Sequence, residues 1–131
     1  MKAASPLNTT AVSPAPTFEK IKSVADLDAR LASSTKPVML DFYADWCVSC
    51  KEMEKFTFAD PQVAAKMVQF TLLKADVTAN NEDDKALLKR FGLFGPPGII
   101  FFKDGQEIAG LRVVGYQPAD QFLPTLDKAL R

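Results

Sequence analysis

The sequence contains no histidine, and only two of its 131 residues are cysteines. The missing histidines exclude histidine general bases, cysteine–histidine nucleophile pairs and nearly every set of zinc ligands that proteins use. No apolar run approaches the roughly 20 residues that a membrane-spanning helix needs, so we expect no direct insertion of this segment into a membrane. Any chemistry must therefore use sulfur, carboxylates or amines.

The sequence also lacks an excess of charge of either sign, because 16 Lys and Arg residues balance 16 Asp and Glu residues. No overall field attracts nucleic acid or anionic lipid, and we expect no nucleic-acid partner. Hydrophobic residues make up 47% of the chain and charged residues 24%, as is usual in a globular domain. A chain of this length buries a core without the help of disulfide or metal staples. We also expect a monomer without metal or other cofactor.

Residues 1–17 are small and polar, with three prolines and no aromatic side chain. Such a segment buries too little apolar surface to offset the entropy of ordering, which predicts a flexible linker. It also lacks the apolar stretch of about 7 to 15 residues that marks a secretory signal. We therefore expect one folded domain over residues 18–131, preceded by a linker.

From residue 18 onward, apolar periodicity and capping residues predict alternating strands and helices. Strands are expected at residues 18–22, 38–43 and 70–77, and a hairpin at residues 99–102 and 107–114. Helices are expected from a cap at Ser23 to about residue 32, from Cys47 with a break at residues 58–61, at residues 82–91, and at residues 118–130 with a kink or restart at Pro124. Asp60 is expected to cap the segment after the break, and Asn81 and Gly92 to begin and close the helix at residues 82–91. The expected core includes Phe70, Leu72, Leu73, Leu87, Leu88 and Phe101. This order predicts an α/β fold with a mixed central sheet and helices on both faces.

Both cysteines lie in one Cys-x-x-Cys motif, Cys47 to Cys50, between a predicted buried strand and a predicted helix. The motif alone fits a redox dithiol, half of a zinc site or a short structural disulfide. Its position favours the redox dithiol. A zinc site would need two more ligands from carboxylates or a second chain, and a disulfide that closes so short a loop adds little stability.

The predicted helix start gives the two sulfurs different roles. Unpaired backbone N–H groups and the positive end of the helix dipole favour the thiolate of Cys47, which predicts that Cys47 attacks the partner. Cys50 lies one turn further along and is expected to be buried, protonated and able to resolve the mixed disulfide. Asp41 and Glu54 are expected near the sulfurs, where an anion raises a thiol pKa and makes the dithiol more reducing. Glu54 fits a solvated helix face equally well.

The segment from Asp41 to Lys51 resembles the active-site stretch of the thioredoxin family, and Pro97 resembles that family's cis-proline. More narrowly, residues 43–52, 57–63 and 76–80 are similar to the C-terminal domain of the DsbD family of membrane thiol:disulfide interchange proteins. The resemblance implies a thioredoxin fold and a protein-disulfide reductase whose only redox group is its own disulfide.

The resemblance also implies a place in the cell and partners. It predicts a periplasmic domain of an inner-membrane protein that takes electrons from the transmembrane domain and passes them to the N-terminal domain, in electron transfer that also serves cytochrome c biogenesis. Residues 1–17 would be the tether. Within the site, the resemblance implies that Asp41 relays a proton for Cys50 and that Glu54 matches an acidic position of the family.

Partner docking is expected on an apolar surface made of Trp46, Val48, Phe94, Pro96 and Pro97. Trp46 fits half-buried packing equally well. Base rates favour a trans peptide bond before Pro97, but the motif match predicts cis. Pro96 has no N–H, so one of the two backbone hydrogen bonds that the family offers to a partner at this position is expected to be missing.

Two other interpretations fit parts of the sequence. A free-standing general thioredoxin would share the chemistry, although Val48 and Ser49 replace the usual Gly-Pro of that group. A non-catalytic thioredoxin-fold binding module would keep the disulfide as an inert link. Insulin reduction separates this last interpretation from both enzymes.

Overall fold

The computed structural model of the protein describes residues 16–131, so the linker expected at residues 1–17 lies almost wholly outside the described residues. The strands are β1 (Glu19–Ile21), β2 (Val38–Tyr43), β3 (Thr71–Asp76), β4 (Gly98–Lys103), β5 (Gln106–Glu107) and β6 (Val113–Val114). The helices are α1 (Val24–Ser33), α2 (Val48–Glu52), α3 (Pro61–Met67), α4 (Glu82–Arg90) and α5 (Ala119–Leu130). A π-helical turn, η2 (Met53–Thr57), continues α2. The predicted α/β order is confirmed.

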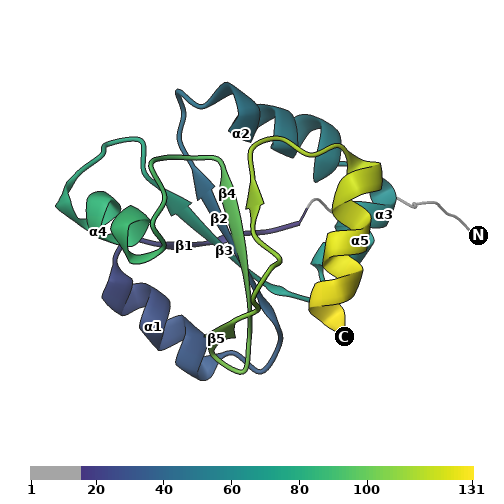
Figure 1. Cartoon of the computed structure of the whole chain (residues 1–131), viewed down its shortest axis with the longest axis horizontal. Coiled ribbons are helices and arrows are strands. Elements are labelled where there is room, and N and C mark those ends of the chain that lie inside the picture. Colours follow the sequence, from purple (N-terminus) through teal and green to yellow (C-terminus); the bar gives the residue numbers. More distant parts are fainter. Residues whose placement is uncertain (1–15) are drawn as a thin grey trace, which may run out of the picture.

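The strands form one mixed sheet in the order β1-β3-β2-β4-β5, and β6 also pairs with β4. Helices α1 and α4 cover one face, and α3 and α5 cover the other (Figure 1). Alternate residues of β2 supply the two cores: Leu40 and Phe42 pack with α1 and α4, and Met39 packs with α3 and α5. The six residues predicted for the core are all buried. This arrangement is the thioredoxin fold.

Strand directions bring three loops to one end of the sheet. Strand β2 runs parallel to β3, with Tyr43 opposite Asp76 at their carboxyl ends. Strand β4 runs antiparallel to β2, and its first residue, Gly98, lies opposite Phe42. The segments that follow β2 and β3 and the segment that precedes β4 therefore meet at this end, where the dithiol lies.

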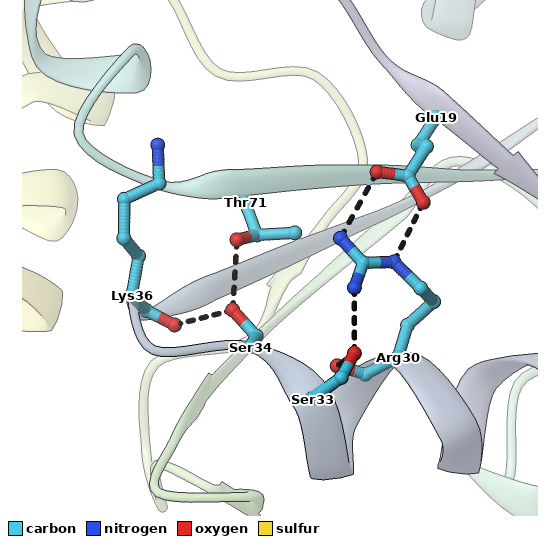
Figure 2. Close-up of polar contacts among 6 residues, drawn as sticks. All are labelled: Glu19, Arg30, Ser33, Ser34, Lys36 and Thr71. Carbon is cyan, nitrogen blue, oxygen red and sulfur yellow. Dashed lines mark hydrogen bonds and ion pairs between the residues drawn. The ribbon is translucent and has the colours of Figure 1, made fainter.

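Polar contacts fasten the opposite end of the sheet (Figure 2). The Arg30 guanidinium on α1 binds the Glu19 carboxylate on β1 through two nitrogens, at 2.6 and 3.0 Å. The hydroxyls of Ser34 and Thr71 lie 2.7 Å apart, and Ser34 also donates to the Lys36 carbonyl at 2.9 Å. The end of α1 and the start of β3 are thereby joined far from the dithiol.

The predicted helix caps are confirmed. Ser23 accepts a hydrogen bond from the Asp26 N–H, and Asp60 accepts from two N–H groups of α3. Asn81 and Asp84 form a reciprocal capping box at the start of α4. Gly92 follows α4 with a φ of 66°, a left-handed conformation that suits glycine at a helix end.

The second arm of the predicted hairpin, residues 107–114, is not one strand. Only its ends pair with β4, as β5 and β6. Gly110, at a φ of 80°, turns the chain between them. Arg112 holds the turned segment, because its guanidinium binds the Glu107 carboxylate and the Phe91 carbonyl, each at 2.6 Å.

The last helix differs from its prediction in having no restart and in where it begins. Helix α5 continues across Pro124 without a restart, and Pro118 is its N-cap and not part of its first turn. An interior proline costs about 3 kcal/mol in an unsupported helix. Here Phe122, before the proline, and Leu126 and Ala129, after it, are fully buried, so core packing holds both halves in one helix.

Candidate active site

Cys47 and Cys50 form a disulfide, with their Cα atoms 5.3 Å apart. Cys47 is the N-cap of α2, and its sulfur accepts a hydrogen bond from the Cys50 N–H at 3.2 Å. The sulfur of Cys50 lies 3.7 Å from the Phe42 carbonyl oxygen at the end of β2. Cys47 is 7% exposed and Cys50 3%, so in this oxidised form the two differ more in hydrogen bonding than in exposure.

The loop that follows β3 supports the residues before the dithiol. The Thr78 hydroxyl accepts a hydrogen bond from the Asp45 N–H at 2.9 Å, and the Thr78 carbonyl accepts one from the Trp46 indole N–H at 3.2 Å. The second of these hydrogen bonds holds the indole N–H of Trp46, while 61% of the surface of Trp46 is exposed. Sequence reasoning did not single out Thr78, although its place directly after a buried strand was a signal.

Exposed apolar side chains lie at the same end of the sheet as the disulfide. Val48 is exposed on the first turn of α2, and Phe94 is fully exposed in the loop before β4. Pro96 and Pro97 are half-buried, and the peptide bond between them is cis, as predicted. The residues expected to form a docking surface thus come from two segments that the sheet brings to one end.

Two more exposed apolar residues, Val114 and Tyr116, join this end of the sheet. Val114 pairs with Gly98, the residue that follows Pro97. Sequence reasoning missed both residues. Only the antiparallel pairing of β6 with β4 places them beside the proline loop.

Asp41 and Glu54 share one cation, Lys74. Asp41 is 5% exposed on β2 and lies opposite Lys74 of β3 in the parallel register. Burial raises the pKa of Asp41 to about 8, although the Lys74 charge lowers it in part. The Glu54 carboxylate on η2 binds the Lys74 ammonium at 2.7 Å. Glu54 therefore belongs to a partly buried ion pair and is not a free solvated residue.

Lys74 is a member of this cluster that sequence reasoning missed. Its ammonium lies over the Tyr43 ring, 4.5 Å from the centroid, and 5.3 Å from the centroid of Phe18. The sequence did contain an indication of this role, because Lys74 interrupts the apolar run of its strand just as Asp41 interrupts that of β2. Two charges inside neighbouring buried strands are best explained as partners.

A cavity of about 500 Å³ opens beside the Glu54–Lys74 ion pair, with Phe18 and Phe58 in its wall. The cavity gives this ion pair access to water and does not border the disulfide. Among residues 16–131, no cluster of His, Cys, Asp or Glu is arranged to hold a metal ion. In the same range, no helix has the length and apolar character needed to cross a membrane.

A disulfide at the start of a helix, a cis-proline loop at the same end of the sheet, and helices on both faces define a thioredoxin-like protein. The family described as "Thioredoxin-like domain" matches residues 26–130. The oxidised C-terminal domain of DsbD from Neisseria meningitidis superposes with a TM-score of 0.69 at 40% identity, over 82% of this chain and 91% of that chain. Its reduced form gives a TM-score of 0.67 at 41% identity, over 82% of this chain and 92% of that chain.

Two longer proteins are also similar to this chain over most of its length. The thiol:disulfide interchange protein DsbD of Ralstonia nicotianae is 54% identical over 116 residues, which cover 86% of this chain and 19% of that protein. DsbD of Pectobacterium atrosepticum is 53% identical over 112 residues, covering 85% of this chain and 19% of that protein. The chain thus spans about a fifth of the length of these relatives. It belongs to the thioredoxin-like family and, within that family, to the C-terminal thiol:disulfide interchange domains of DsbD.

Proposed function

We propose that this chain is a protein-disulfide reductase that passes reducing equivalents to partner proteins through Cys47 and Cys50. The observation that carries the proposal is the place of Cys47 as the N-cap of α2, bonded to Cys50 one turn away. In the reduced protein the same N–H groups and helix dipole stabilise a thiolate. The kinship with DsbD C-terminal domains supports the same chemistry.

The first step joins the protein to its partner. The Cys47 thiolate attacks one sulfur of the partner disulfide, forming a mixed disulfide and breaking the partner's S–S bond. The electron pair of that bond leaves with the partner's second sulfur as a thiolate, which takes up a proton from water. Trp46, Val48, Phe94, Pro96 and Pro97 provide the surface on which the partner docks.

The second step releases the partner. Cys50 loses its proton and attacks the Cys47 sulfur, so that the Cys47–Cys50 disulfide forms and the partner's first sulfur leaves as a thiolate. The partner has gained two electrons and the chain has lost two. We propose Asp41 as the group that accepts the Cys50 proton, since Asp41 neighbours Phe42, whose carbonyl lies 3.7 Å from the Cys50 sulfur. A pKa near 8 suits a group that both takes and returns a proton near neutral pH.

We further propose where the electrons come from and go. The relatives are named as DsbD, and this chain corresponds to about a fifth of their length, so the electron donor and acceptor are expected in the rest of such a protein. We assign the donor to a transmembrane domain and the acceptor to an N-terminal domain, with this domain in the periplasm. The segment before residue 18 would join the domain to its donor.

Trapping tests the proposal directly. A Cys50→Ser variant keeps the attacking sulfur but cannot resolve the mixed disulfide, so it should accumulate disulfide-linked partners in cells that express the whole parent protein. Mass spectrometry then names the partners. Cys47→Ser is the matched control, because the remaining Cys50 lies within α2, away from the helix start, and should capture no partner. Equal capture by both variants, or capture by neither, would contradict the proposed roles.

A second measurement separates the enzyme from an inert binding module. The isolated domain, supplied with dithiothreitol, should accelerate insulin reduction, and the Cys47→Ser variant should not. Absence of acceleration by the native sequence would leave only a non-catalytic role for the fold.

A further inference from the structure

The backbone of Gln117, between β6 and α5, is held by side chains of the dithiol helix. The Thr57 hydroxyl on η2 donates a hydrogen bond to the Gln117 carbonyl at 2.5 Å. The Gln117 N–H in turn donates to the Met53 sulfur at 3.3 Å. Thr57 is fully buried and Met53 is 2% exposed, so the side-chain partner in each bond is shielded from water, whereas Gln117 is only partly buried.

Gln117 is connected in turn to the proline loop. Two residues before it, the Gly115 N–H points to the Pro97 carbonyl at 3.4 Å. Strand β6 also pairs with β4, with Val114 opposite Gly98. A short chain of contacts therefore runs from the helix that carries Cys50, through Gln117, to the loop that carries Pro97.

The π-helical turn brings both side chains to this segment. The Phe58 N–H bonds to the Met53 carbonyl at 2.8 Å, which closes the wider turn that a π-helix makes. Met53 and Thr57, four residues apart in η2, consequently reach the same residue. Such turns occur often at functional sites, and this one directly continues the helix of the disulfide.

We propose that Thr57 and Met53 are positioning residues that fix the Pro97 loop at the right separation from Cys47, so that a docked protein disulfide reaches the attacking sulfur. The proposal rests on the disulfide exchange proposed above. A partner that contacts both the loop and the dithiol needs a fixed distance between them, and a small displacement of either slows the attack. A small disulfide reagent that touches only the sulfur does not depend on this distance.

The test compares two probes in one pair of variants. Thr57→Val removes the hydroxyl and keeps the shape of the side chain. It should slow insulin reduction roughly three- to tenfold, the effect of losing about one hydrogen bond, while reduction of the small reagent DTNB stays within about twofold. Thr71→Val is the matched control, since it removes one hydroxyl contact to Ser34 at the far end of the same sheet (Figure 2). It should leave both rates unchanged.

Two more variants keep the test decisive. Thr57→Ser retains the hydroxyl and should recover most of the insulin rate, and Met53→Leu removes the sulfur acceptor and should slow insulin reduction without slowing DTNB. Equal insulin rates for Thr57→Val and Thr71→Val, or failure of serine to rescue, would overturn the positioning role. If Thr57→Val does not fold, Met53→Leu with an unchanged insulin rate overturns it. A native protein that reduces neither probe would instead refute the disulfide exchange itself.

Discussion

Asp41 and Lys74 lie opposite each other on neighbouring parallel strands, and both interrupt otherwise apolar segments of the sheet. The charge of Lys74 is not available to Asp41 only, because the Lys74 ammonium also forms an ion pair with Glu54 at 2.7 Å. One cation therefore serves two carboxylates. The buried Asp41 is left with a pKa of about 8, close to the pH at which thiols exchange.

The first prediction concerns Lys74. Replacing Lys74 with Met keeps the aliphatic stem but removes the charge, so the pKa of Asp41 should rise further and Glu54 should lose its partner. We expect a loss of roughly 1–3 kcal/mol in the free energy of unfolding, measured with urea. Lys66→Met is the matched control, because Lys66 pairs with Asp127 at the same 2.7 Å but in a more exposed place. It should cost at most about 1 kcal/mol. Equal losses of unfolding free energy in the two variants would show that the burial of Lys74 does not increase the contribution of its ion pair to stability.

The second prediction is the pH dependence of stability that Asp41 creates. Its folded pKa, about 8, lies above the unfolded value of 3.8, so between these values only the folded state holds the proton. Its contribution is therefore complete below pH 3.8 and is lost as the pH rises to about 8. Asp41→Asn should remove this slope and exceed the native protein in stability at pH 9, by at most about 6 kcal/mol. Urea unfolding at pH 6 and pH 9 measures it, with the exposed Asp28→Asn as control. Parallel slopes for native and Asp41→Asn proteins would contradict the raised pKa.

The third prediction concerns the pKa of Cys47 in the reduced protein. Replacing Glu54 with Gln removes a negative charge, and replacing Asp41 with Asn removes the charge that Asp41 gains as the pH rises through about 8. Either change should lower the apparent pKa of the Cys47 thiol. Because Asp41 itself titrates near pH 8, its replacement should also turn a two-step titration into a single step. Thiolate absorbance against pH measures both effects. No fall in either variant would refute the electrostatic link between the carboxylates and the dithiol.

The fourth prediction is the order of alkylation. In the reduced protein, a limiting amount of iodoacetamide should modify Cys47 well before Cys50, because Cys47 lies at the N-cap of α2 and Cys50 is buried against the Phe42 carbonyl. Peptide mass spectrometry after short reaction times gives the two rates. Faster labelling of Cys50 would reverse the assigned roles.

The fifth prediction concerns Pro96, which carries no N–H and can offer a docked chain only its carbonyl. Pro96→Ala restores the donor with little bulk. It should bind a partner that mimics the mixed disulfide equally well or several-fold more tightly, since a net hydrogen bond contributes about 0.5–1.5 kcal/mol. The reduction potential of the dithiol should change little. Clearly weaker binding by an equally stable variant would show that the rigidity of Pro96 matters more than the missing donor.

Local sequence was enough for most elements and for the dithiol. The run at residues 38–43, the caps Ser23, Asp60 and Asn81, and the Cys-x-x-Cys spacing each act within a few residues, where capping and periodicity decide the structure. A restart at Pro124 and an unbroken second arm of the hairpin were predicted and are absent, because longer-range packing overrides local preference at both places. Buried residues on both sides of Pro124 keep α5 whole, and Arg112 holds the segment that divides the expected second arm of the hairpin.

The sequence by itself determined which groups carry the chemistry, because the only two cysteines share one motif at a helix start. Tertiary structure decided what surrounds them. The parallel register of β2 and β3 paired Asp41 with Lys74, and the π-helical turn brought Met53 and Thr57 to Gln117. These partners are 20 or more residues apart in the chain, and no local periodicity encodes which of them meet. Strand pairing and core packing alone set those distances.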